Sequence, residues 1–300
     1  MTTFRSPLGK ALVGVALAAT VASAQSPSAF DSTKAWEHVR QQLAIGPRPS
    51  GSPGNVKTRQ YITAQLTTLG IKTTEQAFTG ATPLGPVKMV NIIGTIPGKS
   101  ADRIILASHF DTKLFRDARF VGASDGASST AALIELGRVL KTRKDLPFTI
   151  ELLFLDGEEA VIEWVGNDNT YGSRHYVDAA RKSGSLKSIR ALILLDMIGD
   201  RNLTIRRESN STPWLTGIVW ATARKLGHSQ FMDEETAVED DHIPFVKAGV
   251  PSLDIIDLDY PQWHTPQDTI DAIAARSIQI VGDVVVAALP QIEARLLNGR

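Results

Sequence analysis

The chain of 300 residues contains no cysteine, and this absence limits both its stabilisation and its chemistry. No disulfide can form, no thiolate can act as a nucleophile, and no cysteine sulfur can bind a metal. Stability must therefore come from the buried core. Any catalysis must use histidine, carboxylates, hydroxyl groups or a metal ion held by such groups.

The chain also lacks an excess of charge of either sign, because 32 Lys and Arg balance 32 Asp and Glu. Without a positive field we expect no binding of nucleic acid. Aromatic residues make up only 6% of the chain, whereas hydrophobic residues make up 43%. This composition is typical of globular protein and excludes disordered, collagen-like and coiled-coil chains.

No apolar run reaches the roughly 20 residues that a membrane-spanning helix needs. A shorter apolar run, residues 11–22, follows two basic residues and ends in the small-residue pattern Ala22-Ser23-Ala24. This arrangement is typical of a cleaved signal peptide, and an uncleaved N-terminal anchor is the alternative. We predict a signal peptide over residues 1–24 and a single domain over residues 25–300. The mature chain would be an exported monomer, in the periplasm or the medium, with no membrane span.

Apolar strands alternate with helices along most of the chain. The segments that predict strands are 90–94, 103–107, 148–155, 191–195 and 251–256. The segments that predict helices are 31–44, 52–70, 127–141, a stretch after residue 171, 213–226 and 272–297. Continuous apolar strands separated by helices indicate an α/β three-layer sandwich. Its central mixed sheet should be mostly parallel and covered on both faces.

Histidine and carboxylate residues follow four of the predicted strands. They are His109 and Asp111, then Asp156, Glu158 and Glu159, then Asp196, and finally Asp257 and His264. In open α/β sheets, ligands bind just beyond the carboxyl ends of the strands. We therefore expect these side chains to converge on one edge of the sheet and to form a metal site or an acid–base site.

Each of these residues also has a purely structural interpretation. Asp125 precedes a helix and could be its N-cap, Glu158 and Glu159 could be a solvated acidic pair, and His264 could be an ordinary surface residue. If Asp125, Glu159 and His264 meet, however, they supply two carboxylates and one imidazole. That set neutralises Zn²⁺ and leaves a fourth position open. Glu158 would then lie beside the ion, where burial among other acids raises its pKa and suits it to proton transfer.

Several longer strings carry a resemblance to a known family. They are Asp156-Gly157-Glu158-Glu159-Ala160, Trp164, Tyr171-Gly172-Ser173-Arg174-His175, residues 239–245, Gly249-Val250-Pro251 and Trp263-His264-Thr265. From about residue 35 to its C-terminus, the chain resembles animal-type glutaminyl cyclases, or glutaminyl-peptide cyclotransferases, of the zinc-exopeptidase superfamily. The Gly-Glu-Glu string alone fits any aminopeptidase of that superfamily, whereas Trp164 and the string that begins at Tyr171 are cyclase-like.

The resemblance implies the fold of that superfamily, also called phosphorylase/hydrolase-like, and one zinc ion per chain. Its ligands would be Asp125, Glu159 and His264. The activity would be the cyclisation of an N-terminal glutamine, in a peptide or protein, to pyroglutamate with release of ammonia.

The resemblance also implies roles for residues around the zinc. Glu158 would be the general acid and base, and Asp196 and Asp240 would form a hydrogen-bonded acidic cluster behind it. Trp164, Trp263 and Tyr260 would line the substrate pocket.

The chain departs from the animal pattern at a few positions. Ser108 and Thr130 stand where the animal enzymes carry a disulfide, and Asp254 stands where they have histidine. The loop before Trp263 is about one residue shorter. These departures bear on stability and substrate affinity more than on the type of reaction.

Two other functions fit the same residues. In a two-zinc aminopeptidase, His109 and Asp196 would hold a second metal ion with Asp125 bridging, and the enzyme would hydrolyse peptide bonds at the N-terminus. A non-catalytic peptide-binding protein on this scaffold is the third possibility. The presence of Glu158 and of all three zinc-ligand residues argues against it.

Overall fold

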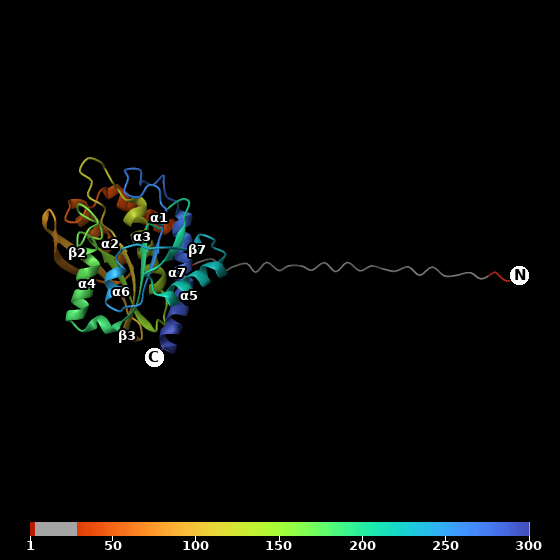
Figure 1. The fold of residues 1–300 in the computed structure, drawn as a ribbon. Helices are drawn as coiled ribbons and strands as arrows, with labels where there is room; N and C mark the ends of the chain where they lie inside the picture. Colours follow the sequence, from red (N-terminus) through yellow and green to blue (C-terminus); the bar gives the residue numbers. More distant parts are fainter. Residues whose placement is uncertain (4–28, 300) are drawn as a thin grey trace.

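The computed structural model describes residues 1–3 and 29–299, and Figure 1 shows their arrangement. The predicted cleavage site after Ala24 and most of the predicted signal peptide lie outside the described residues, so both stay predictions. Among the residues described, no helix combines the length and apolar character needed to cross a membrane.

A six-stranded mixed sheet forms the centre of the molecule, in the order β1-β2-β4-β3-β5-β8. Its strands are β1 (Lys72–Thr82), β2 (Gly85–Ile96), β3 (Ser100–His109), β4 (Phe148–Leu155), β5 (Ile189–Asp196) and β8 (Ser252–Ile256). Strands β4, β3, β5 and β8 run parallel to one another, whereas β1 and β2 form an antiparallel hairpin at one edge and β2 pairs antiparallel with β4. The mostly parallel sheet agrees with the prediction.

Helices cover both faces of this sheet (Figure 1). One face carries α1 (Ser32–Ile45), α2 (Pro53–Thr68), α3 (Ser129–Lys141), α5 (Pro213–Leu226) and α7 (Ala275–Asn298). The other face carries α4 (Tyr171–Lys182) and α6 (Ile243–Lys247). Each face has its own buried apolar cluster, because strands in a sandwich of this kind are apolar on both sides. The predicted three-layer fold is confirmed.

Local sequence signals explain where the first two helices begin. The Asp31 carboxylate accepts a hydrogen bond from the backbone N–H of Thr33 at the start of α1. At the start of α2, the Ser52 hydroxyl accepts a hydrogen bond from the backbone N–H of Asn55, and Pro53 occupies the first helical position. Such caps satisfy backbone N–H groups that have no partner inside the helix.

Several elements lie outside the predicted pattern, among them β1 and α6. Strands β6 (Ile205–Glu208) and β7 (Phe231–Thr236) form a separate two-stranded parallel sheet. A short π-helical segment, η1 (Ala123–Ser128), precedes α3, and a 3₁₀ turn, η2 (Ser185–Ser188), precedes β5. Segment η1 contains Asp125 and breaks from helical dihedral angles at that residue, so it shapes the site described next.

Candidate metal centre

The structure brings Asp125, Glu159 and His264 together beyond the carboxyl ends of the parallel strands. Asp125 belongs to η1, Glu159 follows β4, and His264 lies in the loop after β8. His264 Nε2 is 3.4 Å from Asp125 Oδ2 and 3.2 Å from Glu159 Oε2. One ligand atom from each residue lies within 4.8 Å of the others. The convergence expected from the strand ends is therefore present.

The unpaired oxygens at this site fit a cation. Asp125 Oδ2 and both carboxylate oxygens of Glu159 are buried and accept no hydrogen bond. Buried carboxylate oxygens without a partner are costly, and a metal ion supplies the missing partner. Two carboxylates with one imidazole suit Zn²⁺. Because Glu158 and Glu159 are 6% and 4% exposed, a solvated acidic pair does not describe them.

Asp268 holds the Asp125 segment in place. Its carboxylate accepts hydrogen bonds from the backbone N–H groups of Ser124, at 2.8 Å, and Asp125, at 3.1 Å. The Tyr260 hydroxyl donates to the same carboxylate at 2.7 Å. Since the Asp125 carboxylate faces histidine rings and α3 begins at Ser129 with no side-chain cap, Asp125 is not an N-cap.

A glycine lets His109 pack against the turn that follows Asp125. Gly126 has φ of +82°, which favours glycine, and a Cβ there would lie 2.9 Å from His109 Cε1. Burial alone would raise the pKa of Asp125, but the hydrogen bond and charge of His109 lower it below its usual value. Asp125 is therefore held as a carboxylate.

The backbone of the two glutamates rests on Asp111. The carboxylate of Asp111 accepts from the N–H of Glu158 at 3.2 Å and from the N–H of Glu159 at 3.4 Å. Directly before them, Gly157 has φ of +75°. This tight turn aims two adjacent carboxylates into one small space from the end of a buried strand.

Glu158 is buried, and its environment differs from that of Glu159. Burial is the main cause that raises the pKa of Glu158 well above its usual value, and the charges of Glu159, Asp240 and Asp241 add to this effect. His109 opposes it, with Nδ1 at 3.8 Å from Glu158 Oε2. A carboxyl group with a raised pKa can take up and return a proton at neutral pH.

His109 and Asp196 form a second donor set beside the first. His109 Nε2 lies 3.0 Å from Asp196 Oδ1 and 3.3 Å from Asp125 Oδ1. Burial raises the pKa of Asp196 to about 6. These distances suit either direct hydrogen bonds or three ligands of a second ion, so this geometry alone is compatible with one metal or with two.

Behind the site lies a buried acidic cluster that includes Asp240 and Asp254. His242 Nε2 is 3.0 Å from Glu208 Oε2, and its Nδ1 is 3.6 Å from Asp254 Oδ2. Burial is the main cause that raises the pKa of Asp240, and also that of Asp254, whose pKa lies well above its usual value. His242 thus supplies an imidazole next to Asp254, the position where the animal enzymes carry their own histidine.

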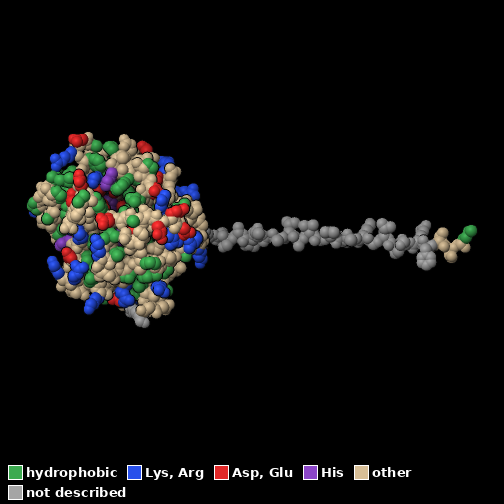
Figure 2. Space-filling model, in the orientation of Figure 1, with side chains coloured by type: hydrophobic (Ala, Val, Ile, Leu, Met, Phe, Trp, Pro, Cys, Tyr) green, Lys and Arg blue, Asp and Glu red, His purple; other side chains and the backbone are tan. Residues whose placement is uncertain are grey.

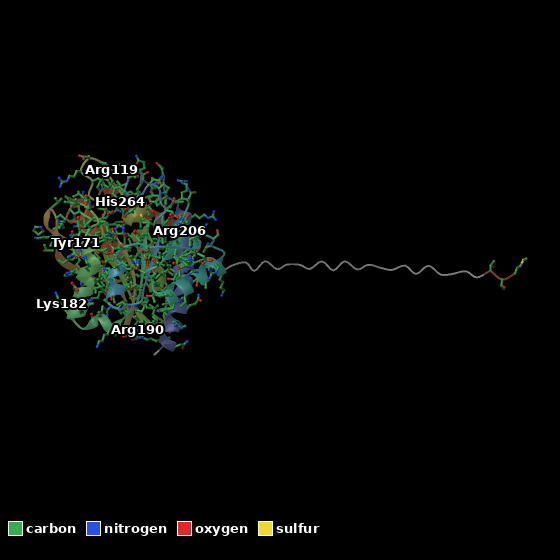
Figure 3. The ribbon with its side chains drawn as sticks, in the orientation of Figure 1. Arg119, Tyr171, Lys182, Arg190, Arg206 and His264 are labelled. Carbon is green, nitrogen blue, oxygen red and sulfur yellow. The ribbon has the colours of Figure 1, made fainter. Side chains whose placement is uncertain are left out.

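A cavity of about 660 Å³ opens over these groups. Trp164 and Trp263 line it, together with Asp125, Glu158, Asp196, Asp240, His264 and apolar residues such as Met197, Val238 and Leu258. Figure 2 shows a histidine at a hollow on this face, at the place where Figure 3 labels His264. His264 lies at the end of the molecule opposite to Lys182 and Arg190.

Tyr260 is the one predicted pocket residue that is not among those lining this cavity. It is 2% exposed, and its hydroxyl is taken up by Asp268. The ring of Tyr260 is buried because the loop after β8 folds back over the Asp125 segment. We therefore correct its assignment from a wall of the pocket to a support of Asp268.

Three residues that hold the site together were not predicted from the sequence. They are Arg48, Asp111 as a backbone acceptor, and Asp268. Arg48 is the single charged residue in residues 46–51, a stretch rich in Gly and Pro, and it is completely buried. A charged residue inside a run of Gly and Pro is the feature of the sequence that could have identified Arg48.

The three-layer fold and the Asp–Glu–His donor set at its carboxyl edge are those of a zinc-exopeptidase-like α/β protein. The sequence profile of Peptidase family M28 matches residues 91–289. A glutaminyl-peptide cyclotransferase-like protein of Bos taurus is 33% identical over 270 residues, which cover 80% of this chain and 70% of that protein. The chain belongs to peptidase family M28.

Solved structures give the same result. The glutaminyl cyclase of an Acidobacteriales bacterium is 41% identical, with a TM-score of 0.86, and the match covers 93% of this chain and 100% of that one. The glutaminyl cyclase of Porphyromonas gingivalis is 29% identical, with a TM-score of 0.81, over 88% of this chain and 99% of that one. The resemblance to glutaminyl cyclases predicted from sequence is confirmed.

Proposed function

We propose that this protein is a zinc-dependent glutaminyl cyclase, which converts an N-terminal glutamine into pyroglutamate and releases ammonia. The observation that carries the proposal is the Asp125–Glu159–His264 donor set, whose two carboxylates would balance the charge of Zn²⁺, with the buried Glu158 beside it. The names of the relatives support the same activity. The proposed substrates are therefore peptides or proteins that begin with glutamine.

Asp125, Glu159 and His264 would hold the zinc. When bound, zinc polarises the γ-carbonyl of the substrate glutamine as a Lewis acid. The substrate's own α-amine attacks the γ-carbon, so that a C–N bond forms within the glutamine residue. Glu158 accepts the proton that the amine loses and returns it to the departing amide nitrogen as the old C–N bond breaks. Ammonia leaves and no water is consumed.

Trp164 and Trp263 would hold the substrate side chain. Their rings belong to different loops and line the same cavity as Glu158. Apolar walls favour the folded, ring-forming conformation of glutamine because they exclude water from the reacting atoms. Asp196 and Asp240 line the cavity next to Glu158, and the charge of Asp240 adds to the burial that raises the pKa of Glu158 and would keep its proton available.

A second candidate function is that of a two-metal aminopeptidase. It rests on the His109–Asp125–Asp196 set, whose ligand atoms also lie within 4.8 Å of one another. With a second ion there, the same cavity would hydrolyse the first peptide bond of a peptide. Both functions use one scaffold and share Asp125, so the number of bound metal ions separates them.

We also propose that the mature chain is exported, to the periplasm or the medium, after removal of residues 1–24. The basic and apolar pattern before Ala24 supports this proposal. The N-terminus of the exported chain, sequenced from periplasmic and medium fractions, gives the site of cleavage and the destination.

A coupled ammonia assay tests the main proposal. The purified mature chain is incubated with a glutamine-initiated dipeptide and, in parallel, with an amino-acid p-nitroanilide, while its metal content is measured. A glutaminyl cyclase releases ammonia from the dipeptide, leaves the anilide intact and contains close to one zinc per chain. Free amino acid, cleaved anilide and close to two zinc ions per chain would instead establish the aminopeptidase.

A further inference from the structure

Arg48 is a buried cation at the base of the proposed metal centre, and no catalytic step uses it. Its side chain is completely buried. Burial lowers the pKa of Arg48 to about 10, while Asp125, Asp268, Asp111 and Glu159 act in the opposite direction. The guanidinium therefore stays protonated at neutral pH, next to the acids that would bind zinc.

The guanidinium of Arg48 joins two separate segments of the site. Its Nε donates to the carbonyl oxygen of Phe110 at 2.7 Å. Its Nη1 and Nη2 donate to the carbonyl oxygens of Val121, at 2.5 Å, and Gly122, at 2.9 Å. Phe110 lies between His109 and Asp111, and Gly122 directly precedes η1, which carries Asp125.

The backbone around Arg48 is itself fixed. Its N–H donates to the Thr112 hydroxyl at 3.0 Å, and Ser50 from the same turn donates to the Asp156 carboxylate at 2.6 Å. The turn is therefore attached to the ends of both β3 and β4. The planar fork of the guanidinium spreads its N–H donors over three nitrogen atoms and reaches a different carbonyl with each, whereas the three donors of lysine sit on a single nitrogen.

We propose that Arg48 is a positioning residue for the metal centre. It fixes the spacing between the segment after β3 and the Asp125 segment, and its charge offsets the excess of carboxylates there. The proposal depends on the metal centre but not on the choice between cyclisation and peptide hydrolysis. Residues that orient metal ligands typically contribute 10- to 100-fold to metal affinity.

The test compares the zinc affinity of the full mature chain with that of Arg48→Lys and Arg48→Met, by competition against a chromophoric chelator. Arg48→Lys keeps the charge and loses the fork, whereas Arg48→Met loses both. We expect zinc binding about tenfold weaker or more in Arg48→Lys, and weaker still in Arg48→Met. The kcat of each variant should recover when zinc is raised to saturation, which a misfolded protein would not show.

Arg143→Met is the matched control. Arg143 forms a two-pronged ion pair with Glu293, at 3.0 and 2.7 Å, beyond the C-terminal end of α3. Since α3 is about 20 Å long and η1 lies at its other end, this variant should lose stability and keep wild-type zinc affinity. The decrease in the unfolding free energy of Arg143→Met relative to wild type, measured without metal, gives the loss of stability caused by removing a partly buried arginine.

A folded Arg48→Lys protein with wild-type zinc affinity would overturn the proposal. So would a loss of activity in Arg48→Lys that saturating zinc does not restore while zinc binding is unchanged. If Arg48→Met does not fold, because three carbonyls lose their donors, Arg48→Lys alone decides. Absence of zinc binding by the wild-type chain would refute the metal centre itself, a result distinct from equal affinities in wild type and variants.

Discussion

Glu158 and Glu159 are neighbours in sequence, but their carboxylates face different partners. Glu159 Oε2 lies 3.2 Å from His264 Nε2, in the donor set for zinc. Glu158 Oε2 lies 3.8 Å from His109 Nδ1, among acids whose charges raise its pKa. One turn after β4 therefore supplies both the proposed zinc ligand and the proposed proton carrier.

Replacing Glu158 by glutamine should separate these two roles. Glu158→Gln keeps the size of the side chain and cannot accept a proton, so we expect kcat to fall by about 100-fold or more. Zinc affinity should change little, because the three ligands remain. Kinetics with a glutamine dipeptide and zinc content check this, with the exposed Glu37→Gln as control. Substantial turnover in Glu158→Gln would refute the assigned proton transfer.

At the scale of secondary-structure elements, β3 and α3 meet through two hydroxyl groups. Ser108 Oγ lies 3.3 Å from Thr130 Oγ1, and the Thr130 hydroxyl also donates to the carbonyl of His109 at 2.7 Å. Both side chains are fully buried. The contact connects the strand that ends in His109 to the helix that follows the Asp125 segment, as expected for positions that the animal enzymes join by a disulfide.

Introducing that disulfide should stabilise the fold. We expect the Ser108→Cys, Thr130→Cys double variant to gain about 3 kcal/mol in unfolding free energy when oxidised, because the cross-link restricts the unfolded chain. The same protein with reductant is the control, and denaturant titration is the measurement. An oxidised form less stable than the reduced one would mean that the two positions cannot be bridged without strain.

The strands that the sequence predicted well are rich in apolar residues along their length, whereas the missed strands are not. Segments 148–155 and 191–195 are continuous apolar runs, and they became buried strands. Strand β1 has mostly exposed or half-exposed side chains and many threonines, and β7 is almost wholly exposed, so neither has an apolar pattern to detect. Strand β1 pairs with the adjacent β2 across a tight turn, whereas β7 pairs with β6 across α5.

The residues of the site likewise divide into those that a sequence pattern identifies and those that it does not. Asp125, Glu159 and His264 could be named from sequence because each ends or follows a strand or begins a helix, and because the longer strings resemble known cyclases. Asp268 and Arg48 act through backbone atoms of other segments, and a sequence pattern does not record which carbonyl or N–H a side chain will meet. Tyr260 was misplaced for the same reason.

At the scale of the whole molecule, the predicted export and the proposed activity both make a prediction about one residue, Gln25. Cleavage after Ala24 would leave Gln25 as the first residue of the mature chain. An active glutaminyl cyclase should convert Gln25 to pyroglutamate, with loss of one ammonia. Intact mass spectrometry of the exported protein checks this, and the Glu158→Gln variant is the control. A wild-type chain that keeps an uncyclised Gln25 would count against self-modification.

The three residues of the donor set lie far apart in the sequence, between positions 125 and 264. Asp125 precedes α3, Glu159 follows β4, and His264 lies between β8 and α7. Helix α7 in turn packs against α1 at the other end of the described chain. A nascent chain on the ribosome therefore lacks the imidazole until most of its synthesis is complete. If zinc is held as proposed, its complete set of ligands therefore forms only after the segment beyond β8 has been synthesised.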